Sequence, residues 1–268
     1  MSAPLPRSRL TPRALLLAPL RLVYALWGAL VFLTVGLAAL ALLALLPGIA
    51  RRRAAARRCA RVLLGLAGMP VTLRHTERLP AGQCVVVCNH ASYLDGVVLT
   101  AALPARFAFV IKREMAAVPL AGALLRRLGS EFVERTDRNR SAADARRVLR
   151  NVTSGHSLVF FPEGTFTPSP GLLKFHTGAF ASAARAGCPV VPAVLRGTRR
   201  ALPPSGALPR PGRLAFEILP SITPEASEPD AAAAELRDRA RAAILEALGE
   251  PDLTYCADTG RPPDTAPA

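Results

Sequence analysis

The sequence predicts a single α/β domain with a mixed, mostly parallel sheet flanked by helices, preceded by an N-terminal membrane helix. Residues 22–46 hold 25 consecutive uncharged positions, which as a helix would measure about 37 Å against a hydrocarbon core of about 30 Å. After residue 70, short apolar runs alternate with longer helical patterns, as in α/β folds. Several of the short runs are continuously apolar, which is typical of strands covered on both faces.

The chain divides by composition into five parts. We predict a basic N-terminal segment (1–21), a membrane anchor (22–50), a polybasic interfacial helix (51–69), the α/β domain (70–250) and a disordered tail (251–268). A cleaved signal peptide is disfavoured, because its apolar region would be about 7 to 15 residues long and would end in small residues, whereas Pro47, Gly48 and an arginine block follow this run.

Charge is distributed unevenly along the chain. The net charge is +15, and residues 1–150 carry all of the excess, with six arginines between positions 51 and 61. A basic block beside an apolar run predicts contact with an anionic membrane surface, and nucleic-acid binding is disfavoured because no binding motif accompanies it. We expect the protein to lie in a bacterial inner membrane, with the α/β domain on the cytoplasmic side. Because both flanks of the run are basic, spanning and re-entrant arrangements both stay open.

The elements of the domain follow from the apolar runs and the helical patterns between them. The predicted strands are Val71–His75, Cys84–Cys88, Phe107–Ile111, Glu131–Glu134, Leu158–Phe161, Val190–Leu195 and Leu214–Leu219. The predicted helices are Gly96–Leu103, Pro119–Leu128, Ser141–Thr153, Gly178–Ala186 and Ala231–Leu248. Five cysteines without repeated spacing predict reduced thiols and no disulfide framework.

The stretch CNHASYLDG, residues 88–96, places His90 and Asp95 after a predicted buried strand, where α/β sheets bind ligands. On a regular helix, positions five apart point about 140° away from each other. A turn through Ala91 and Ser92 would instead fold the carboxylate onto the imidazole and leave the other ring nitrogen as a general base. The alternative is an Asp N-cap beside a turn histidine.

In two further stretches, a predicted strand is followed by polar residues. FFPEGTF, residues 160–166, offers Glu163 as acceptor, Thr165 as donor and Gly164 for close backbone approach. LGSEFVERTDRNR, residues 128–140, offers Arg135, whose guanidinium could fork onto a phosphate. The alternative for residues 160–166 is an ordinary turn at the end of a strand. The alternative for Arg135 is a solvated surface arginine.

Other chemistries fit less well. Gly155-His156-Ser157 lacks the last glycine of a nucleophile elbow and precedes a strand, whereas the serine of an elbow comes after one. A Cys88 thiolate with His90 as its base is possible on an extended strand, but a small core cysteine is commoner. A zinc site with Cys84 fails because residues four apart on a strand are separated by about 13 Å. We predict no metal.

Together these stretches resemble the glycerolipid acyltransferase family that includes the 1-acylglycerol-3-phosphate acyltransferases. Its first motif, NHxxxxD, matches Asn89, His90 and Asp95. The second, a glycine and a hydrophobic residue before a basic one, is similar to Gly129, Phe132 and Arg135; the third, FPEGT, matches residues 161–165; the fourth, a strand with a central proline, is similar to VVPAVL around Pro192.

The resemblance implies transfer of a fatty acyl group from acyl-CoA or acyl carrier protein to the hydroxyl of a lysophospholipid, without a cofactor. By position, His90 is the base and Asp95 orients it, and the implied substrate-binding residues are Asn89, Arg135, Glu163, Gly164, Thr165 and Lys174. The third motif commonly ends in arginine, but Phe166 stands there, with Lys174 or His176 as candidate replacements. This departure leaves acylation of another lyso-lipid as an alternative, and a non-catalytic lipid-binding protein as one of another class.

Overall fold

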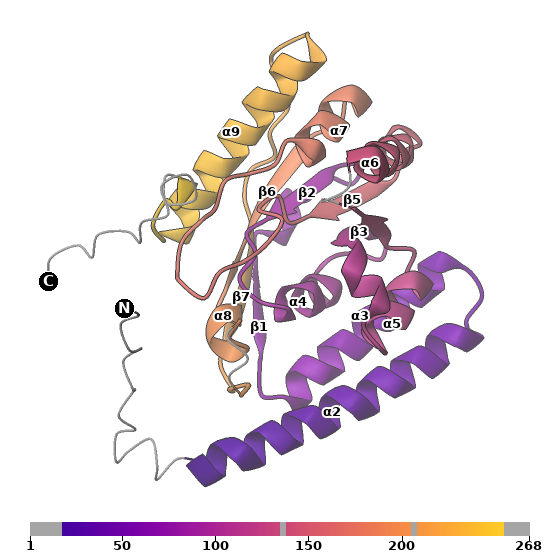
Figure 1. Ribbon diagram of the computed structural model, residues 1–268, viewed down its shortest axis with the longest axis vertical. Coiled ribbons are helices and arrows are strands. Elements are labelled where there is room, and N and C mark those ends of the chain that lie inside the picture. The colour runs from indigo at the N-terminus through magenta and orange to yellow at the C-terminus, as the bar shows by residue number, and fades with distance from the viewer. Residues whose placement is uncertain (1–17, 135–137, 205–207, 255–268) are drawn as a thin grey trace, which may run out of the picture.

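The computed structural model describes residues 18–134, 138–204 and 208–254, and Figure 1 shows their arrangement. All seven predicted strands form, and each end lies within one residue of its predicted position. They are β1 (Val71–Arg74), β2 (Val85–Cys88), β3 (Phe107–Lys112), β4 (Glu131–Val133), β5 (Ser157–Phe160), β6 (Val190–Arg196) and β7 (Leu214–Ile218).

The strands form one sheet in the order β1-β7-β6-β2-β5-β3-β4. Only the β6–β7 pair is antiparallel, so the predicted mixed, mostly parallel sheet is confirmed. Because β2 lies between β5 and β6 and is parallel to both, the carboxyl ends of these three strands meet at one edge. Three of the four sequence motifs lie on these strands or on the loops after them.

Helices cover both faces of this sheet (Figure 1). They are α2 (Ala18–Leu45), α3 (Ile49–Leu66), α4 (Leu94–Ala102), α5 (Ala121–Arg127), α6 (Arg138–Thr153), α7 (Gly178–Ala186), α8 (Thr198–Ala201) and α9 (Pro229–Leu248). Helix α9 begins two residues earlier than predicted, because Pro229 suits the first turn and the Glu228 carboxylate caps Ala231 N at 2.7 Å. The short helix α8 was not predicted.

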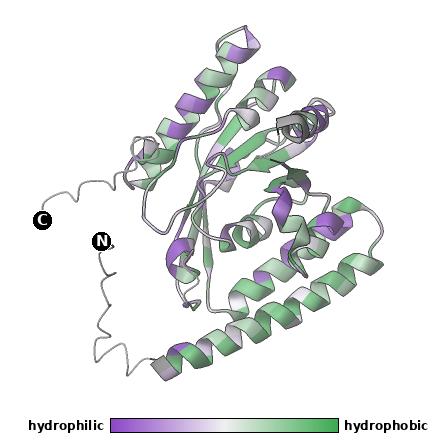
Figure 2. Cartoon of the chain, viewed as in Figure 1, coloured by the Kyte–Doolittle hydropathy of each residue, from purple (hydrophilic) through white to green (hydrophobic). Residues whose placement is uncertain are grey.

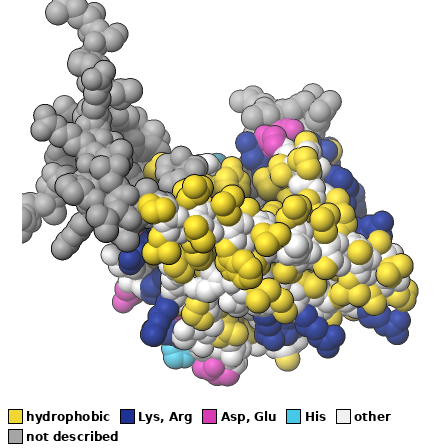
Figure 3. All heavy atoms as spheres, turned by 90° about the horizontal axis from the view of Figure 1, so that it is seen from below, with side chains coloured by type: hydrophobic (Ala, Val, Ile, Leu, Met, Phe, Trp, Pro, Cys, Tyr) yellow, Lys and Arg dark blue, Asp and Glu magenta, His cyan; other side chains and the backbone are white. Residues whose placement is uncertain are grey.

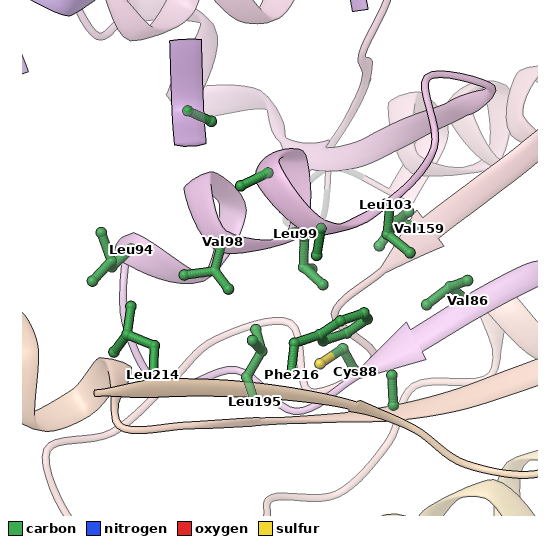
Figure 4. Close-up of a cluster of buried hydrophobic side chains, with 14 of the residues drawn as sticks. Val86, Cys88, Leu94, Val98, Leu99, Leu103, Val159, Leu195, Leu214 and Phe216 are labelled. Atoms are coloured by element: carbon green, nitrogen blue, oxygen red, sulfur yellow. The ribbon is translucent and has the colours of Figure 1, made fainter. Parts of the chain in front are cut away.

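Alternating side chains of the sheet build two apolar cores. Val86 and Cys88 of β2 face α4, whose Val98 and Leu99 are fully buried against them (Figure 4). Val85 belongs to the opposite core with α6, α7 and α9. Each fully buried aliphatic side chain contributes about 1.5 to 3 kcal/mol. The central strands are therefore fixed from both sides, and so are the loops at their carboxyl ends.

Helix α2 is apolar along almost its whole length (Figure 2). The most apolar 18-residue window within residues 19–45 has a mean hydropathy of 2.5, and only 22% of that window is buried. The helix does not stand away from the domain, because it lies along α3: Tyr24 Oη donates to Ala67 O at 2.6 Å and Trp27 Nε1 donates to Leu66 O at 3.0 Å. Its outward side chains form an apolar face with basic residues at the margin (Figure 3).

The arginines of α3 correct one sequence prediction. Arg53, Arg57 and Arg61 do not all turn toward a membrane surface, since their guanidinium groups donate to backbone carbonyls of the domain, including Leu128 O, Ala101 O and Ala102 O. The last carbonyls of a helix have no partner within the helix, and a cationic side chain can donate hydrogen bonds to them. This part of the predicted polybasic patch therefore attaches α3 to the domain.

The predicted disordered tail, residues 251–268, is wrong for its first four residues. Leu253 is 5% exposed, and its backbone N–H donates to Leu172 O at 3.0 Å. Asp252 pairs with Arg241 of α9, so residues 251–254 pack on the loop that follows the third motif. The rest of the predicted tail lies outside the described residues.

Candidate active site

His90 lies on the loop after β2, and Asp95 lies in the first turn of α4. A turn joins them, since Asp95 Oδ2 accepts hydrogen bonds from His90 Nδ1 at 2.8 Å, Ala91 N at 2.7 Å and Ser92 N at 2.9 Å. The carboxyl group is fully buried. An ionised carboxylate only accepts, so Nδ1 carries the imidazole proton and Nε2 holds a lone pair. The turn does bring the predicted pair together.

Two phenylalanines hold the imidazole ring of His90. Phe161 stacks on it with ring centroids 4.1 Å apart, and Phe166 contacts it edge-on at 4.5 Å. The side chain is 17% exposed, and its Nε2 has no hydrogen-bond partner among the described residues. The orientation of the ring is therefore set by the bond from Nδ1 to Asp95 and by the contacts with Phe161 and Phe166, while Nε2 stays available to a substrate.

Asn89 has a different place from the predicted substrate contact. Its side chain is 3% exposed, its Nδ2 donates to Leu195 O at 3.0 Å, and its Oδ1 accepts from Leu195 N at 2.7 Å. Both polar atoms of the amide are thus used on the backbone of β6. Asn89 fixes the first motif to the fourth, which is a positioning role.

Glu163 also acts through the backbone. Its Oε1 accepts from His90 N at 2.6 Å and its Oε2 accepts from Leu173 N at 2.8 Å, in a turn where Gly164 adopts a φ of 73° that favours glycine. The carboxyl group is 4% exposed, and burial raises its pKa to about 7. Glu163 therefore ties the third motif to His90, a positioning contact that its predicted place among the substrate-binding residues did not include.

This raised pKa predicts a pH-dependent contribution to stability. Between about pH 4.5, where an exposed glutamate ionises, and about pH 7, the folded state keeps a proton that the unfolded state has lost. The contribution is complete below pH 4.5 and is lost as the pH rises through about 7. We expect the Tm of the wild type to fall more steeply from pH 5 to pH 8 than that of Glu163→Gln, whose amide does not titrate. Thermal unfolding of both proteins in one detergent measures this; parallel curves would contradict it.

The remaining predicted residues differ in how the structure places them. Thr165 and Lys174 are exposed beside the site, and Lys174 follows Leu173, whose N–H donates to Glu163. Arg135 lies outside the described residues.

Sequence reasoning missed Tyr93, whose ring contacts Phe166 with the ring centroids 4.9 Å apart. Its position inside the first motif was the available signal.

The structure argues against the two alternative nucleophiles, Cys88 and Ser157. The Cys88 thiol is fully buried, and burial together with the charges of Asp95 and Glu163 holds its pKa well above 9, so it is a poor nucleophile. Ser157 starts β5 at the opposite edge of the sheet, where its Oγ accepts from Cys84 N at 3.3 Å. Within the described residues no cluster of metal-ligating side chains occurs.

Fold and site together define an α/β protein that presents a histidine, oriented by a buried carboxylate, where its parallel strands end. Residues 70–196 match the profile of the acyltransferase family. The matched segment holds all four motifs, so the resemblance that they predicted is confirmed.

Two known proteins are similar in sequence to part of this chain. The chain is 36% identical to a chloroplastic 1-acyl-sn-glycerol-3-phosphate acyltransferase of Brassica napus, over 47% of this chain and 37% of that protein. It is 33% identical to a lyso-ornithine lipid O-acyltransferase of Pseudomonas aeruginosa, over 53% of this chain and 54% of that protein. The chain thus spans about half or less of the length of these two relatives.

A crystal structure provides a third comparison. The 1-acyl-sn-glycerophosphate acyltransferase of Thermotoga maritima superposes with a TM-score of 0.69 at 21% identity, over 85% of this chain and 95% of that one. At this identity the likeness concerns the fold alone.

Proposed function

We propose that this protein transfers a fatty acyl group from a thioester, acyl-CoA or acyl carrier protein, to the free hydroxyl of a lysophospholipid. The observation that carries the proposal is the 2.8 Å bond between His90 Nδ1 and buried Asp95, which leaves Nε2 as a base at the ligand-binding edge of the sheet. A thioester is already activated toward attack. One base and a bound acceptor therefore suffice for the chemistry, and no cofactor is proposed.

The reaction can be written with these groups alone. As the acceptor hydroxyl oxygen attacks the thioester carbonyl carbon, His90 Nε2 takes the hydroxyl proton and Asp95 stabilises the imidazolium. Collapse of the tetrahedral intermediate breaks the carbon–sulfur bond, and the imidazolium proton passes to the departing thiolate. The products are an ester and a free thiol, and no acyl-enzyme forms.

For the acceptor we propose 1-acyl-glycerol-3-phosphate, which gives phosphatidic acid. The Brassica relative bears the name of this activity, and the first and third motifs lie together around one base. The finding that favours a second candidate is Phe166, whose ring occupies the edge of His90 in place of the usual basic residue. An acceptor without a phosphomonoester, of the kind named by the Pseudomonas relative, is that second candidate.

We further propose that α2 and α3 hold the domain on the cytoplasmic side of a bacterial inner membrane. The packing of α2 along α3 supports an arrangement in which α2 lies in the membrane surface or re-enters it. Its exposed leucines and Trp27 would face the acyl chains, and basic residues at the margin would meet anionic headgroups. This placement brings the site to the level at which lipid acceptors and products reside.

The test is acyl transfer by the purified, detergent-solubilised chain with labelled acyl-CoA and acyl carrier protein as donors. We expect transfer to 1-acyl-glycerol-3-phosphate to exceed transfer to lyso-ornithine lipid by about tenfold or more, because a charged headgroup bond is worth about 1.5 to 3 kcal/mol. The reverse preference would establish the second candidate. Lipid binding without transfer from either donor would instead indicate a non-catalytic lipid-binding protein.

A further inference from the structure

A cleft of about 450 Å³ opens beside the His–Asp site, between the turn that follows β6 and the end of α9. Ala91, the neighbour of His90, lines one side, and Gly197, Thr198 and Glu250 are among the residues on the others. Four arginines also line it: Arg196, Arg199, Arg200 and Arg210. The cleft is distinct from the groups that carry the proposed chemistry, and no sequence motif pointed to it.

The charge of this cleft is only partly neutralised. Arg196 pairs with Glu217 at 2.8 Å and Arg199 pairs with Glu250 at 2.7 Å. Glu250 is the only carboxylate among the lining residues that the structure describes. Arg200 and Arg210 are exposed, and neither forms an ion pair with a described carboxylate. Two guanidinium groups are thus available to an anion.

Two of the residues that line the cleft also carry buried polar atoms without partners. Thr198 is fully buried, and its Oγ1 has no hydrogen-bond partner among the described residues; the same holds for Arg199 Nε. A buried donor without a partner costs about 1 to 3 kcal/mol, and a bound water, ion or ligand is one of the ways in which such an atom gains its partner. A hydroxyl and a guanidinium N–H are both donors suited to phosphate oxygens.

The cleft is coupled to the catalytic loop by short connections. The positive charge of Arg199 opposes the rise in the pKa of Glu163, whose carboxylate accepts from His90 N at 2.6 Å. Leu195, which also lines the cleft, forms the two hydrogen bonds with Asn89. A ligand held here would therefore lie against the same loop that positions the base.

We propose that this cleft binds a phosphate group of a substrate, with Arg200 and Arg210 as its principal contacts and Thr198 and Arg199 as further donors. The inference rests on the proposed acyl transfer, because both kinds of substrate there carry phosphate. The phosphate belongs either to the headgroup of the acceptor or to the CoA or phosphopantetheine part of the donor. The two sources share the chemistry that guanidinium groups recognise.

The test compares wild type with Arg200→Ala/Arg210→Ala. The matched control is Arg146→Ala/Arg150→Ala, which removes the same charge from exposed positions of α6. Each protein is assayed with acyl-CoA or an acyl-N-acetylcysteamine, which lacks phosphate, and with 1-acyl-glycerol-3-phosphate or monoacylglycerol as acceptor. We expect KM for the phosphate-bearing substrate to rise about tenfold or more in the cleft variant and to stay unchanged in the control.

The substrate for which KM rises identifies the source of the phosphate. A rise in KM confined to acyl-CoA assigns the cleft to the donor, and a rise confined to 1-acyl-glycerol-3-phosphate assigns it to the acceptor. Equal KM values for wild type and cleft variant with every substrate would overturn the proposal.

A binding measurement keeps this inference separate from the proposed function. CoA and 1-acyl-glycerol-3-phosphate are titrated calorimetrically into His90→Ala and into the same protein with Arg200→Ala/Arg210→Ala. If the wild type transferred no acyl group, the proposed function would fail, yet a weaker affinity in the triple variant for either probe would still support the cleft. Equal affinities for both probes would refute it.

Discussion

Replacing His90 by alanine is expected to lower kcat for acyl transfer by about 10³-fold, within the range of 10² to 10⁴ that a positioned base contributes. The imidazole Nε2 is the basic atom that Asp95 and the flanking phenylalanines leave open. KM should change little, because the loss concerns proton transfer rather than binding. Steady-state kinetics with a labelled thioester measures both constants.

The matched control is His156→Ala. This side chain is exposed at the opposite edge of the sheet, next to the start of β5, so its removal should leave kcat unchanged. Thermal unfolding of both variants separates a catalytic loss from misfolding. Full turnover by folded His90→Ala would exclude the His–Asp mechanism, and wild-type lipid binding without any turnover in either protein would favour the lipid-binding alternative.

Replacing Asp95 by asparagine is expected to lower kcat by about a thousandfold while the fold is retained. Three donors converge on Oδ2, so the amide oxygen of asparagine should take that place and keep the ring of His90 oriented. The amide nitrogen would then take the place of Oδ1, which is buried and has no partner among the described residues. The variant loses the negative charge, worth about 4 kcal/mol to an imidazolium about 4 Å away at an effective dielectric of 20.

The matched comparison is Asp95→Ala. Alanine leaves the backbone N–H groups of Ala91 and Ser92 without their acceptor, and each buried donor without a partner costs about 1 to 3 kcal/mol. We therefore expect Asp95→Ala to unfold at a lower temperature than Asp95→Asn at similarly low activity. Near-wild-type kcat in Asp95→Asn would show that the charge is dispensable and that Asp95 only shapes the turn.

Much of the site could be predicted because the information is local. Cys84 to Cys88 is an unbroken apolar run, and His90 and Asp95 come within seven residues of its end. In a parallel sheet, the loop after such a strand lies at the ligand-binding edge. The same reasoning applies to Glu163 after β5. The pairing of β2 with β5 then makes these loops neighbours.

The functions of several individual side chains could not be predicted, because their partners are far away in the sequence. Asn89 bonds to Leu195, 106 positions later, and Glu163 bonds to His90, 73 positions earlier. Both were carried over as substrate contacts, whereas the structure uses their polar atoms on the backbone. Arg53 was assigned to a membrane surface, although its guanidinium donates to Leu128 O, 75 positions later.

The sequence by itself thus determined the class of fold, the strands and the pairing of His90 with Asp95 as the candidate base and its carboxylate. Those features depend on periodicity and on spacings of a few residues, which any chain displays before it folds. Only the tertiary structure decided which polar atoms remain free for a substrate and that Arg199, Arg200 and Arg210 share a cleft with Ala91. The physical reason is that a buried hydrogen bond or a cleft exists only after packing brings distant segments into contact, and local patterns do not encode that arrangement.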